Sequence, residues 1–339
     1  MIINKFIPLR GLISFAGFHI FWPTVYAILI VFLYSKLGWH WIAIPWVSVA
    51  SIGTAVAFYL GFKNSQSYDR MWEARKIWGA IVNSSRSWGA MINSFINNTS
   101  YTDYEIMDIK KKLIYRHIAW LYTLREQLLI PTQWEHISLS WQFGSINVKR
   151  RENHGIGRFT DYLSKEQESN YFFDKFEWEH SSNNATQIIS IQSKEIMGLK
   201  LDGTLEIFHH IELQNILNDF YTHQGQAERI KKFPFPRQFA NSSFLLNTIF
   251  IILMPLGLVA EFAKLGSSEV WIMIPFTALI SWIYIVMELV GDYSENPFEG
   301  LIFDVPMLSI CRNIEIDLLE MIGEDKLPKP IQPINNVLM

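Results

Sequence analysis

Apolar residues in this chain gather into four long blocks instead of alternating with polar residues. The blocks run from Ile13 to Leu37, from Trp41 to Phe62, from Phe244 to Ala263 and from Val270 to Val290. Each block approaches the ~20 apolar residues that a helix needs to cross a bilayer. The pattern therefore predicts four membrane-spanning helices, in two pairs that short connections join.

The pairing of the spans determines which parts of the chain share one side of the membrane. Both chain ends and the polar stretch between the pairs must lie together. Lysine and arginine accumulate on the cytoplasmic side of membrane proteins. Those that flank the spans on the shared side are Lys5, Arg10, Lys63, Arg70, Arg75, Lys76, Arg229, Lys231, Lys232 and Arg237. The short connections offer only Lys36 and Lys264, so we expect an inner-membrane protein with both termini in the cytoplasm.

The polar stretch between the pairs predicts further helices. Four segments show helical spacing of their apolar residues: 63–98, which continues the second span, 103–129, 185–199 and 204–223. Gly225 suits a helix stop, and residues 132–185 look irregular with short helices. Three prolines after Leu327 predict an extended tail. No stretch alternates as a strand would.

These elements predict an all-α membrane protein with four consecutive regions. Residues 1–62 hold the cytosolic N-terminus and the first two spans, and residues 63–240 form a large helical cytosolic region. Residues 241–290 hold the last two spans, and residues 291–339 form a cytosolic C-terminal segment with its extended tail.

Composition supports a membrane protein and excludes several function classes. Half of the residues are hydrophobic and 18% are charged, whereas a soluble domain has about 25% charged residues. The net charge of −3 lacks the basic footprint of a nucleic-acid-binding protein. Cys311 is the only cysteine, so a disulfide framework and a thiolate zinc cluster are excluded, and we expect a buried core residue.

Catalytic and metal-binding arrangements are not visible in the sequence, so we expect neither an enzyme nor a cofactor. His209 and His210 are neighbours on a helix and point apart, which prevents an i, i+4 metal pair. Glu73 with Arg75, and Glu228 with Arg229, are interpreted as structural ion pairs.

Thr54, Phe58 and Phe62 form one stripe of the second span, because they recur at every fourth residue. The stripe is about 12 Å long at the helical rise. Spacing alone favours helix packing or lipid contact over a pore. Small residues crowd the same helix, namely Ser48, Ala50, Ser51, Gly53, Ala55 and Ala57. They indicate close approach to other helices.

Three motifs resemble the bestrophin family, and specifically its bacterial branch. The first is LGFKNSQSYDRMWEARKIWG at residues 60–79, which is close to the family pattern LGFRNxxxYxRxxEARxxWG. The matching residues are Asn64, Tyr68, Arg70, Glu73, Ala74, Arg75, Trp78 and Gly79.

The other two motifs occur in the family's order. GQAERIKKFPFP at residues 225–236, which includes Glu228 and Arg229, resembles the GxxERIxxxPxP segment before the third span. Asn296, Pro297 and Phe298 belong to the ENPF element after the fourth span, and Asp304 opens the D-x-P element that follows it. Together the motifs frame most of residues 1–320.

The resemblance implies a homopentamer around one axial pore, embedded in lipid. The second span and its continuation would line a hydrophobic neck, with Thr54, Phe58 and Phe62 at the neck positions, above a cytosolic vestibule. Thr54 departs from the bulky aliphatic residue usual there, so that end of the neck would be wider and wetter. The lower vestibule constriction is expected within residues 201–208.

The resemblance also raises the question of calcium, which prefers six to eight oxygen ligands. In calcium-regulated members an acidic cluster follows the ENPF element. Here Leu301 stands where an aspartate would complete the site, and only Asp304 and Glu299 remain. The ligand count therefore predicts a channel without calcium activation.

The sequence thus favours a channel for chloride or other small inorganic anions. Phenyl edges carry partial positive charge, and Lys63 below the neck favours anions, whereas Asp69 favours cations. A channel for monovalent cations such as sodium is the first alternative. A non-conducting oligomeric membrane scaffold is the alternative from another class, and a membrane enzyme lacks a catalytic constellation.

Overall fold

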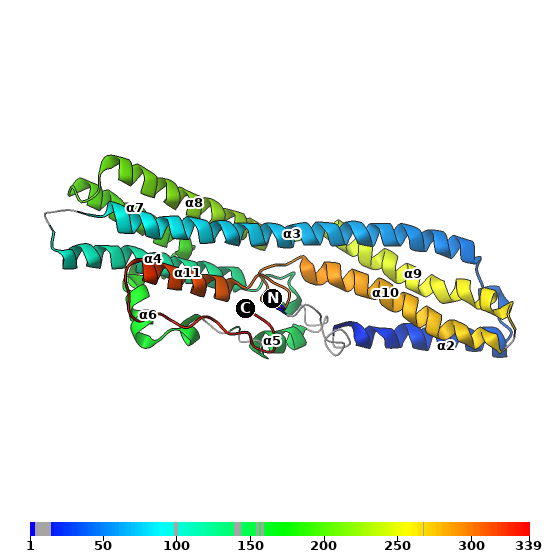
Figure 1. The fold of residues 1–339 in the computed structure, drawn as a ribbon. Coiled ribbons are helices and arrows are strands. Elements are labelled where there is room, and N and C mark those ends of the chain that lie inside the picture. The colour runs from blue at the N-terminus through cyan, green and yellow to red at the C-terminus, as the bar shows by residue number, and fades with distance from the viewer. Residues whose placement is uncertain (4–14, 98–100, 139–143, 154–155, 157–158, 267) are drawn as a thin grey trace. The chain divides into compact units, whose positions relative to one another are not determined.

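The computed structural model describes all residues apart from 4–14, 98–100, 139–143, 154–155, 157–158 and 267. Its α-helices are α2 (Phe21–Lys36), α3 (Trp46–Phe95), α4 (Asp103–Leu129), α5 (Gly144–Asn153), α6 (Lys165–Tyr171), α7 (Asn184–Leu201), α8 (Ile207–Lys232), α9 (Arg237–Ala263), α10 (Met273–Ser294) and α11 (Met307–Met321) (Figure 1). The described residues form isolated β-bridges but no strand. The all-helical prediction is therefore confirmed.

The chain divides into two compact units. The membrane unit comprises residues 4–70 and 234–295, and the large unit comprises residues 1–3, 71–233 and 296–339. Helix α3 contributes its first half to the membrane unit and its second half to the large unit.

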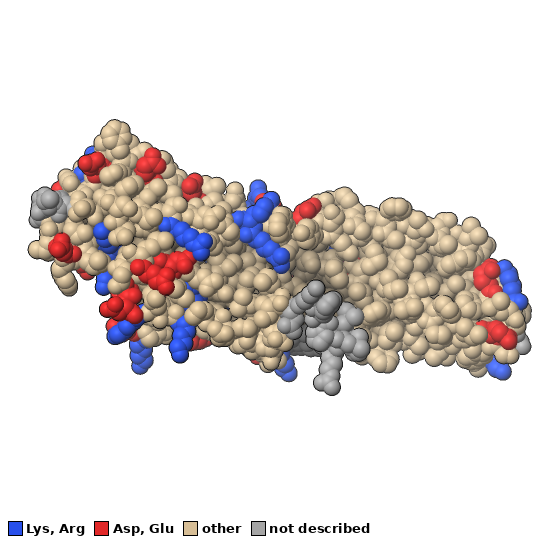
Figure 2. All heavy atoms as spheres, in the orientation of Figure 1, with Lys and Arg blue, Asp and Glu red and all other residues tan. Residues whose placement is uncertain are grey.

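Four helical segments are long and apolar enough to cross a membrane, which confirms the predicted number of spans. They are Gly17–Lys36, His40–Phe95, Ile207–Ala263 and Glu269–Ser294, and each also includes residues beyond its apolar part. Residues 13 and 14 of the predicted first span lie outside the described residues. On the face drawn in Figure 2, the surface over α9 and α10 is largely uncharged between the ends of these helices.

Small residues let the helices of the membrane unit approach closely. A Cβ atom on Gly53 would lie 2.6 Å from the ring of Phe250, and a Cβ atom on Gly257 would lie 2.8 Å from Val49 Cγ2. The hydroxyl of Tyr284 donates to the carbonyl of Gly53 at 3.1 Å. Of the small residues predicted to allow close approach, Gly53 is a packing position in the membrane unit, in line with helix association in lipid, whereas Ser48, Ser51 and Ala55 are exposed.

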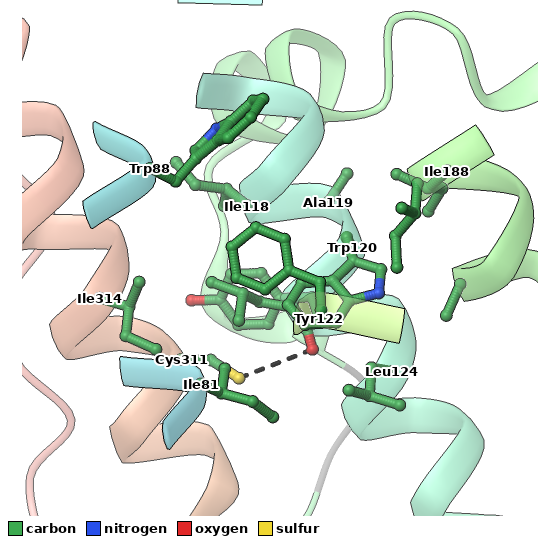
Figure 3. Close-up of a cluster of buried hydrophobic side chains, with 14 of the residues drawn as sticks. Ile81, Trp88, Ile118, Ala119, Trp120, Tyr122, Leu124, Ile188, Cys311 and Ile314 are labelled. Carbon is green, nitrogen blue, oxygen red and sulfur yellow. Dashed lines mark hydrogen bonds between the residues drawn. The ribbon is translucent and has the colours of Figure 1, made fainter. Parts of the chain in front are cut away.

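The core of the large unit is built around α4, which packs against α7, α8 and α11. Thr102 caps α4 in a reciprocal pair with Glu105, an arrangement that satisfies two free backbone donors. Figure 3 shows Trp88 of α3 and Ile118 of α4 among the buried side chains of this core.

Cys311 of α11 belongs to the same core, as the sequence predicts. Its side chain is fully buried and donates to the carbonyl of Leu121 at 3.7 Å (Figure 3). Burial raises the pKa of the thiol to about 12, so Cys311 is an unreactive core residue.

One prediction about the helices of the large unit needs correction, and one helix was not predicted. Helix α8 continues through Gly225 to Lys232, since a single glycine costs a helix only about 1 kcal/mol and Pro234 ends it instead. The sequence interpretation also missed α11, which is the C-terminal helix of the core. The tail after Leu327 contains no helix, as predicted.

A candidate pore stripe and its polar supports

The predicted neck residues lie together on one exposed side of α3. Phe58 is 79% exposed and Phe62 is 52% exposed, and Thr54 is exposed as well. The rings of Phe62 and Phe239 lie 6.1 Å apart between centroids. The Thr54 hydroxyl donates to the carbonyl of Ala50 at 3.0 Å, so only its lone pairs remain free to face a pore.

The exposed side continues along α3 beyond the neck stripe. Its next residues recur at alternating steps of four and three and are Ser65, Asp69, Trp72, Lys76, Gly79, Asn83 and Arg86. Apart from Trp72, these side chains are polar or absent, whereas the opposite side of α3 carries buried residues such as Trp78 and Trp88. Helix α3 therefore offers one exposed stripe that is apolar at Phe58 and Phe62 and, apart from Trp72, carries no apolar side chain from Ser65 to Arg86.

Lys63 does not belong to this stripe, which corrects the expectation that it favours anions below the neck. Its side chain is 1% exposed, and its ammonium lies 2.5 Å from Oε1 of Glu288 on α10. The hydroxyl of Ser243 on α9 donates to the other carboxylate oxygen at 2.5 Å. A buried charge in a membrane protein requires such a partner, and the pair leaves no net charge at this position.

Asn64, the next motif residue, lies against a glycine of α10. A Cβ atom on Gly291 would lie 2.3 Å from Asn64 Oδ1 and 3.5 Å from Lys63 Cε. Asn64 Oδ1 is buried without a hydrogen-bond partner among the described residues. Gly291 is thus the residue that gives α10 room beside the motif.

A second polar network lies seven residues further along both helices. Nε of Arg70 on α3 donates to the carbonyl of Glu295 at 2.9 Å, and the Glu295 carboxylate lies 3.3 Å from Nη1 of Arg237 on α9. The motif residue Arg70 therefore holds the C-terminal end of α10 against α3, which is a structural role.

The glutamates of the motifs form ion pairs with other partners than the sequence suggested. Oε1 of Glu73 lies 2.5 Å from Nη2 of Arg229, and Glu228 pairs with Lys232 at 3.0 Å. The interpretation as structural ion pairs is correct, but Glu73 pairs with Arg229 instead of Arg75, and Glu228 pairs with Lys232 instead of Arg229. Arg229 and Glu73 link α8 to α3 within the large unit.

The remaining residues of the first motif differ in environment. Trp78 is fully buried in the core of the large unit, whereas Tyr68, Arg75 and Gly79 are exposed. No atom outside the helix's own backbone lies within 4 Å of a Cβ atom placed on Gly79. These three residues therefore add to the uncovered surface of α3.

The segment after α10 folds into a tight buried turn. Asn296, Pro297 and Phe298 are buried, and Gly300 adopts a φ of +85°, which favours glycine. One carboxylate oxygen of Asp304 accepts hydrogen bonds from the backbone N–H groups of Gly300 at 2.7 Å and Leu301 at 2.9 Å.

Burial dominates the protonation of Asp304. It raises the pKa of this carboxyl from 3.8 to about 7, the charge of Glu299 adds to the increase, and the two backbone hydrogen bonds oppose it. Asp304 is therefore partly protonated at neutral pH, which makes it a poor ligand for a cation.

The other carboxylates beside this turn already have partners. Glu299 accepts a hydrogen bond from the backbone N–H of Ile137 at 2.9 Å, and Nδ1 of His136 lies 3.1 Å from its second oxygen. Glu135 forms a buried ion pair with Lys231, whose ammonium also donates to the carbonyl of Phe298 at 3.4 Å. Among the residues that the structure describes, no group of three or more His, Cys, Asp or Glu side chains could hold a metal.

The sequence interpretation missed Glu288, Ser243 and Glu135 as partners in these networks. Glu288 could have been found, because it is a single carboxylate inside the fourth apolar block, and such residues are costly in a bilayer. Ser243 and Glu135 carry no comparable signal.

Comparison with known proteins determines the family. Residues 18–320 match the family described as bacterial/fungal bestrophin protein. This chain belongs to that family. The resemblance that the three motifs carry is therefore confirmed.

Curated relatives of this bestrophin are named as channels. The voltage-dependent anion channel-forming protein YneE of Escherichia coli is 26% identical over 315 residues, which cover 91% of this chain and 87% of YneE. The voltage-dependent anion channel-forming protein mll4386 of Mesorhizobium japonicum is 24% identical over 275 residues, which cover 80% of this chain and 74% of mll4386. These are names of channels and not of enzymes, in agreement with the sequence interpretation.

Solved structures share the fold of this bestrophin. The crystal structure of a bacterial bestrophin homolog from Klebsiella pneumoniae superposes with a TM-score of 0.70 at 22% sequence identity. The match covers 91% of this chain and 99% of the homolog. The helical architecture of this chain is therefore that of a bacterial bestrophin.

Proposed function

We propose that this protein forms a channel for chloride or other small inorganic anions, with α3 lining the pore. The observation that carries the proposal is the stripe of Thr54, Phe58 and Phe62, which α3 leaves exposed in the single chain. Relatives that cover most of this chain are named as anion channel-forming proteins. An apolar constriction of this kind can control ion flow by dewetting.

The proposed channel is a homopentamer in the inner membrane, with its termini and large unit in the cytoplasm. Five copies around one axis would place each exposed residue of α3 in a ring of five. The lower constriction is proposed within residues 201–208, where Leu201 is 74% exposed and Phe208 is 75% exposed.

Selectivity for anions is supported by the phenyl groups and not by Lys63. Phenyl edges carry partial positive charge, so rings of Phe58 and Phe62 would favour anions. The pairing of Lys63 with Glu288 removes one argument for anions, and the exposed Asp69 favours cations. A channel for monovalent cations is therefore the second candidate.

Flux from liposomes that contain the purified protein tests the channel and its neck. Phe58→Ala together with Phe62→Ala should raise flux several-fold, because a wider and wetter constriction has a lower dewetting barrier. Phe32→Ala together with Phe244→Ala is the matched control, since these exposed phenylalanines lie on α2 and α9. The control should leave flux at the level of the unchanged protein.

The outcomes of this experiment separate the candidate functions. Gradients of choline chloride and sodium gluconate distinguish an anion channel from a cation channel. No flux from the unchanged protein would favour a non-conducting scaffold. An intact oligomer with unchanged or reduced flux in the Phe58→Ala, Phe62→Ala variant would remove both residues from the pore.

We also propose that calcium does not activate the channel. A calcium site needs several free, ionised oxygen ligands. Near the turn after α10, Glu135 is held by Lys231, Glu299 accepts hydrogen bonds, and the pKa of Asp304 is about 7. Flux should therefore be equal in EGTA and in micromolar calcium, both for the unchanged protein and for Asp304→Asn. Flux that EGTA abolishes and calcium restores would contradict this proposal.

A further inference from the structure

The buried ion pair of Lys63 and Glu288 lies next to Phe62 in the sequence and affects the charge that α3 presents to a passing ion. Lys63 follows Phe62 directly, yet its ammonium is withdrawn among α3, α9 and α10. Glu288 accepts from Lys63 through one oxygen and from Ser243 through the other, both at 2.5 Å. All three side chains are buried, so the pair lies in a medium of low dielectric constant.

Pairing changes the field of a buried lysine strongly. A single ammonium in such a medium acts over a long range, because Coulomb interactions there are much less screened than in water. A close ion pair acts only as a dipole, and its field falls off faster with distance. Removing one partner therefore leaves an uncompensated charge near the neck.

We propose that Glu288 is a specificity-determining residue, which neutralises Lys63 and so prevents a ring of positive charge beside Phe62. The inference rests on the proposed function, in which α3 lines the pore. Each copy of the chain would repeat the pair, so the loss of one partner would add several like charges around the same axis.

A purely structural role of the same network leads to a different expectation. Polar side chains between helices in lipid hold the helices together, and Ser243, Glu288 and Lys63 connect three of them. If that were their whole role, variants would lose assembly or flux, while the ratio of anion to cation permeability would stay the same. Removing the negative charge of Glu288 in one variant and the positive charge of Lys63 in another distinguishes the two roles.

Reversal potentials in planar bilayers under a sodium chloride gradient test the inference on the full-length protein. Glu288→Gln leaves the ammonium uncompensated and should shift selectivity toward anions. Lys63→Gln leaves the carboxylate uncompensated and should shift selectivity toward cations. We expect a change of about three-fold or more in the permeability ratio for each, because like charges near a poorly screened pore act together.

One single variant that assembles is enough for the test, because each shift has its own expected sign, and the double variant Lys63→Gln, Glu288→Gln controls for the loss of the polar network. It buries no charge, and the two shifts should cancel in it. Glu261→Gln is a matched control, because it breaks an exposed ion pair with Lys264 that solvent and salt already screen. Its permeability ratio should equal that of the unchanged protein.

Failure of the inference can be told apart from failure of the proposed function. If the unchanged protein conducts no ions, the channel itself is refuted. If it conducts and the single variants keep its reversal potential, or shift it in the same direction, the role of Glu288 in selectivity is overturned. A strong shift in the double variant would overturn it too, since the pair would then not be electrically neutral.

Discussion

Asp304 is the residue whose environment gives the clearest pH dependence. A carboxyl with a raised pKa in the folded state stabilises the fold while it is protonated, and this contribution is lost as pH rises from 3.8 to about 7. Asp304→Asn should therefore be more stable than the unchanged protein at pH 8, on the order of 4 kcal/mol. At pH 4 the two should be similar. Thermal unfolding at both pH values measures the difference.

A control for this prediction is Asp317→Asn. Asp317 is partly exposed and pairs with Arg86 at 2.8 Å, so its replacement should cost no more than about 1 kcal/mol at either pH. If Asp304→Asn were destabilising at pH 8, the two backbone hydrogen bonds to its carboxylate would outweigh burial, and the sign of the pKa shift would be wrong.

The sequence predicts the exposure of some residues of α3 and not the direction of others. The stripe of Phe58 and Phe62 follows from helical spacing alone, and the structure leaves both residues exposed. The direction of Lys63 does not follow from its neighbours in sequence, because it depends on Glu288 more than two hundred residues later. The sequence therefore predicts that Lys63 faces the pore, whereas the structure pairs it with Glu288 in the interior.

At the scale of helices, Gly291 is the residue that lets α10 pass close beside Asn64 of α3. Gly291→Ala places a Cβ atom 2.3 Å from Asn64 Oδ1, and overpacking of this kind costs about 1–3 kcal/mol. The melting temperature of the variant should fall. Adding Asn64→Ala removes the atom that clashes, so the double variant should regain most of the lost stability.

Two results would contradict the prediction for Gly291. A melting temperature unchanged by Gly291→Ala would mean that Asn64 moves aside without cost. A double variant less stable than either single variant would mean that Asn64 contributes more through its own contacts than it loses by the clash.

Helix boundaries followed from the sequence where strong local signals mark them. The segment from Asp103 to Leu129 was predicted with the bounds of α4, because Thr102 caps one end and Pro131 follows the other. Gly225 does not end α8, because a single glycine inside a long helix costs only about 1 kcal/mol. Helix α11 could have been predicted as well, because Leu308, Cys311, Ile314 and Leu318 recur at helical spacing and are buried.

At the scale of the whole molecule, the assembly itself can be measured. The mass of the protein in detergent should correspond to five copies of the 39.6 kDa chain. Native mass spectrometry or light scattering with detergent correction distinguishes this from other states. A monomer or dimer would contradict the proposed pore, because rings of Phe58 and Phe62 could not close.

The orientation in the membrane has its own test. Asn335→Cys should be inaccessible to an impermeant maleimide in intact cells, whereas Ser268→Cys in the connection between the last two spans should be labelled. The buried Cys311 gives little background because its thiol is unreactive. Labelling of the cysteine at position 335 from outside would reverse the proposed topology.

Assembly and topology differ in how far the chain alone reveals them. The pairing of four apolar blocks and the distribution of lysine and arginine predict the topology from physical rules. The number of copies rests on the family resemblance, since a single chain shows an uncovered side of α3 but not how many copies surround an axis.

The continuity of α3 from Trp46 to Phe95 restricts how this protein can change its length during evolution. Each residue turns a helix by about 100°, so a deletion between Phe62 and Met71 would change the angle around the axis of α3 at which Trp78 and Trp88 follow Phe58. An insertion of seven residues would leave an offset of only about 20°. Substitutions along α3 are therefore far easier to accommodate than insertions or deletions, and changes of length should be confined to whole heptads or to the loops beyond its ends.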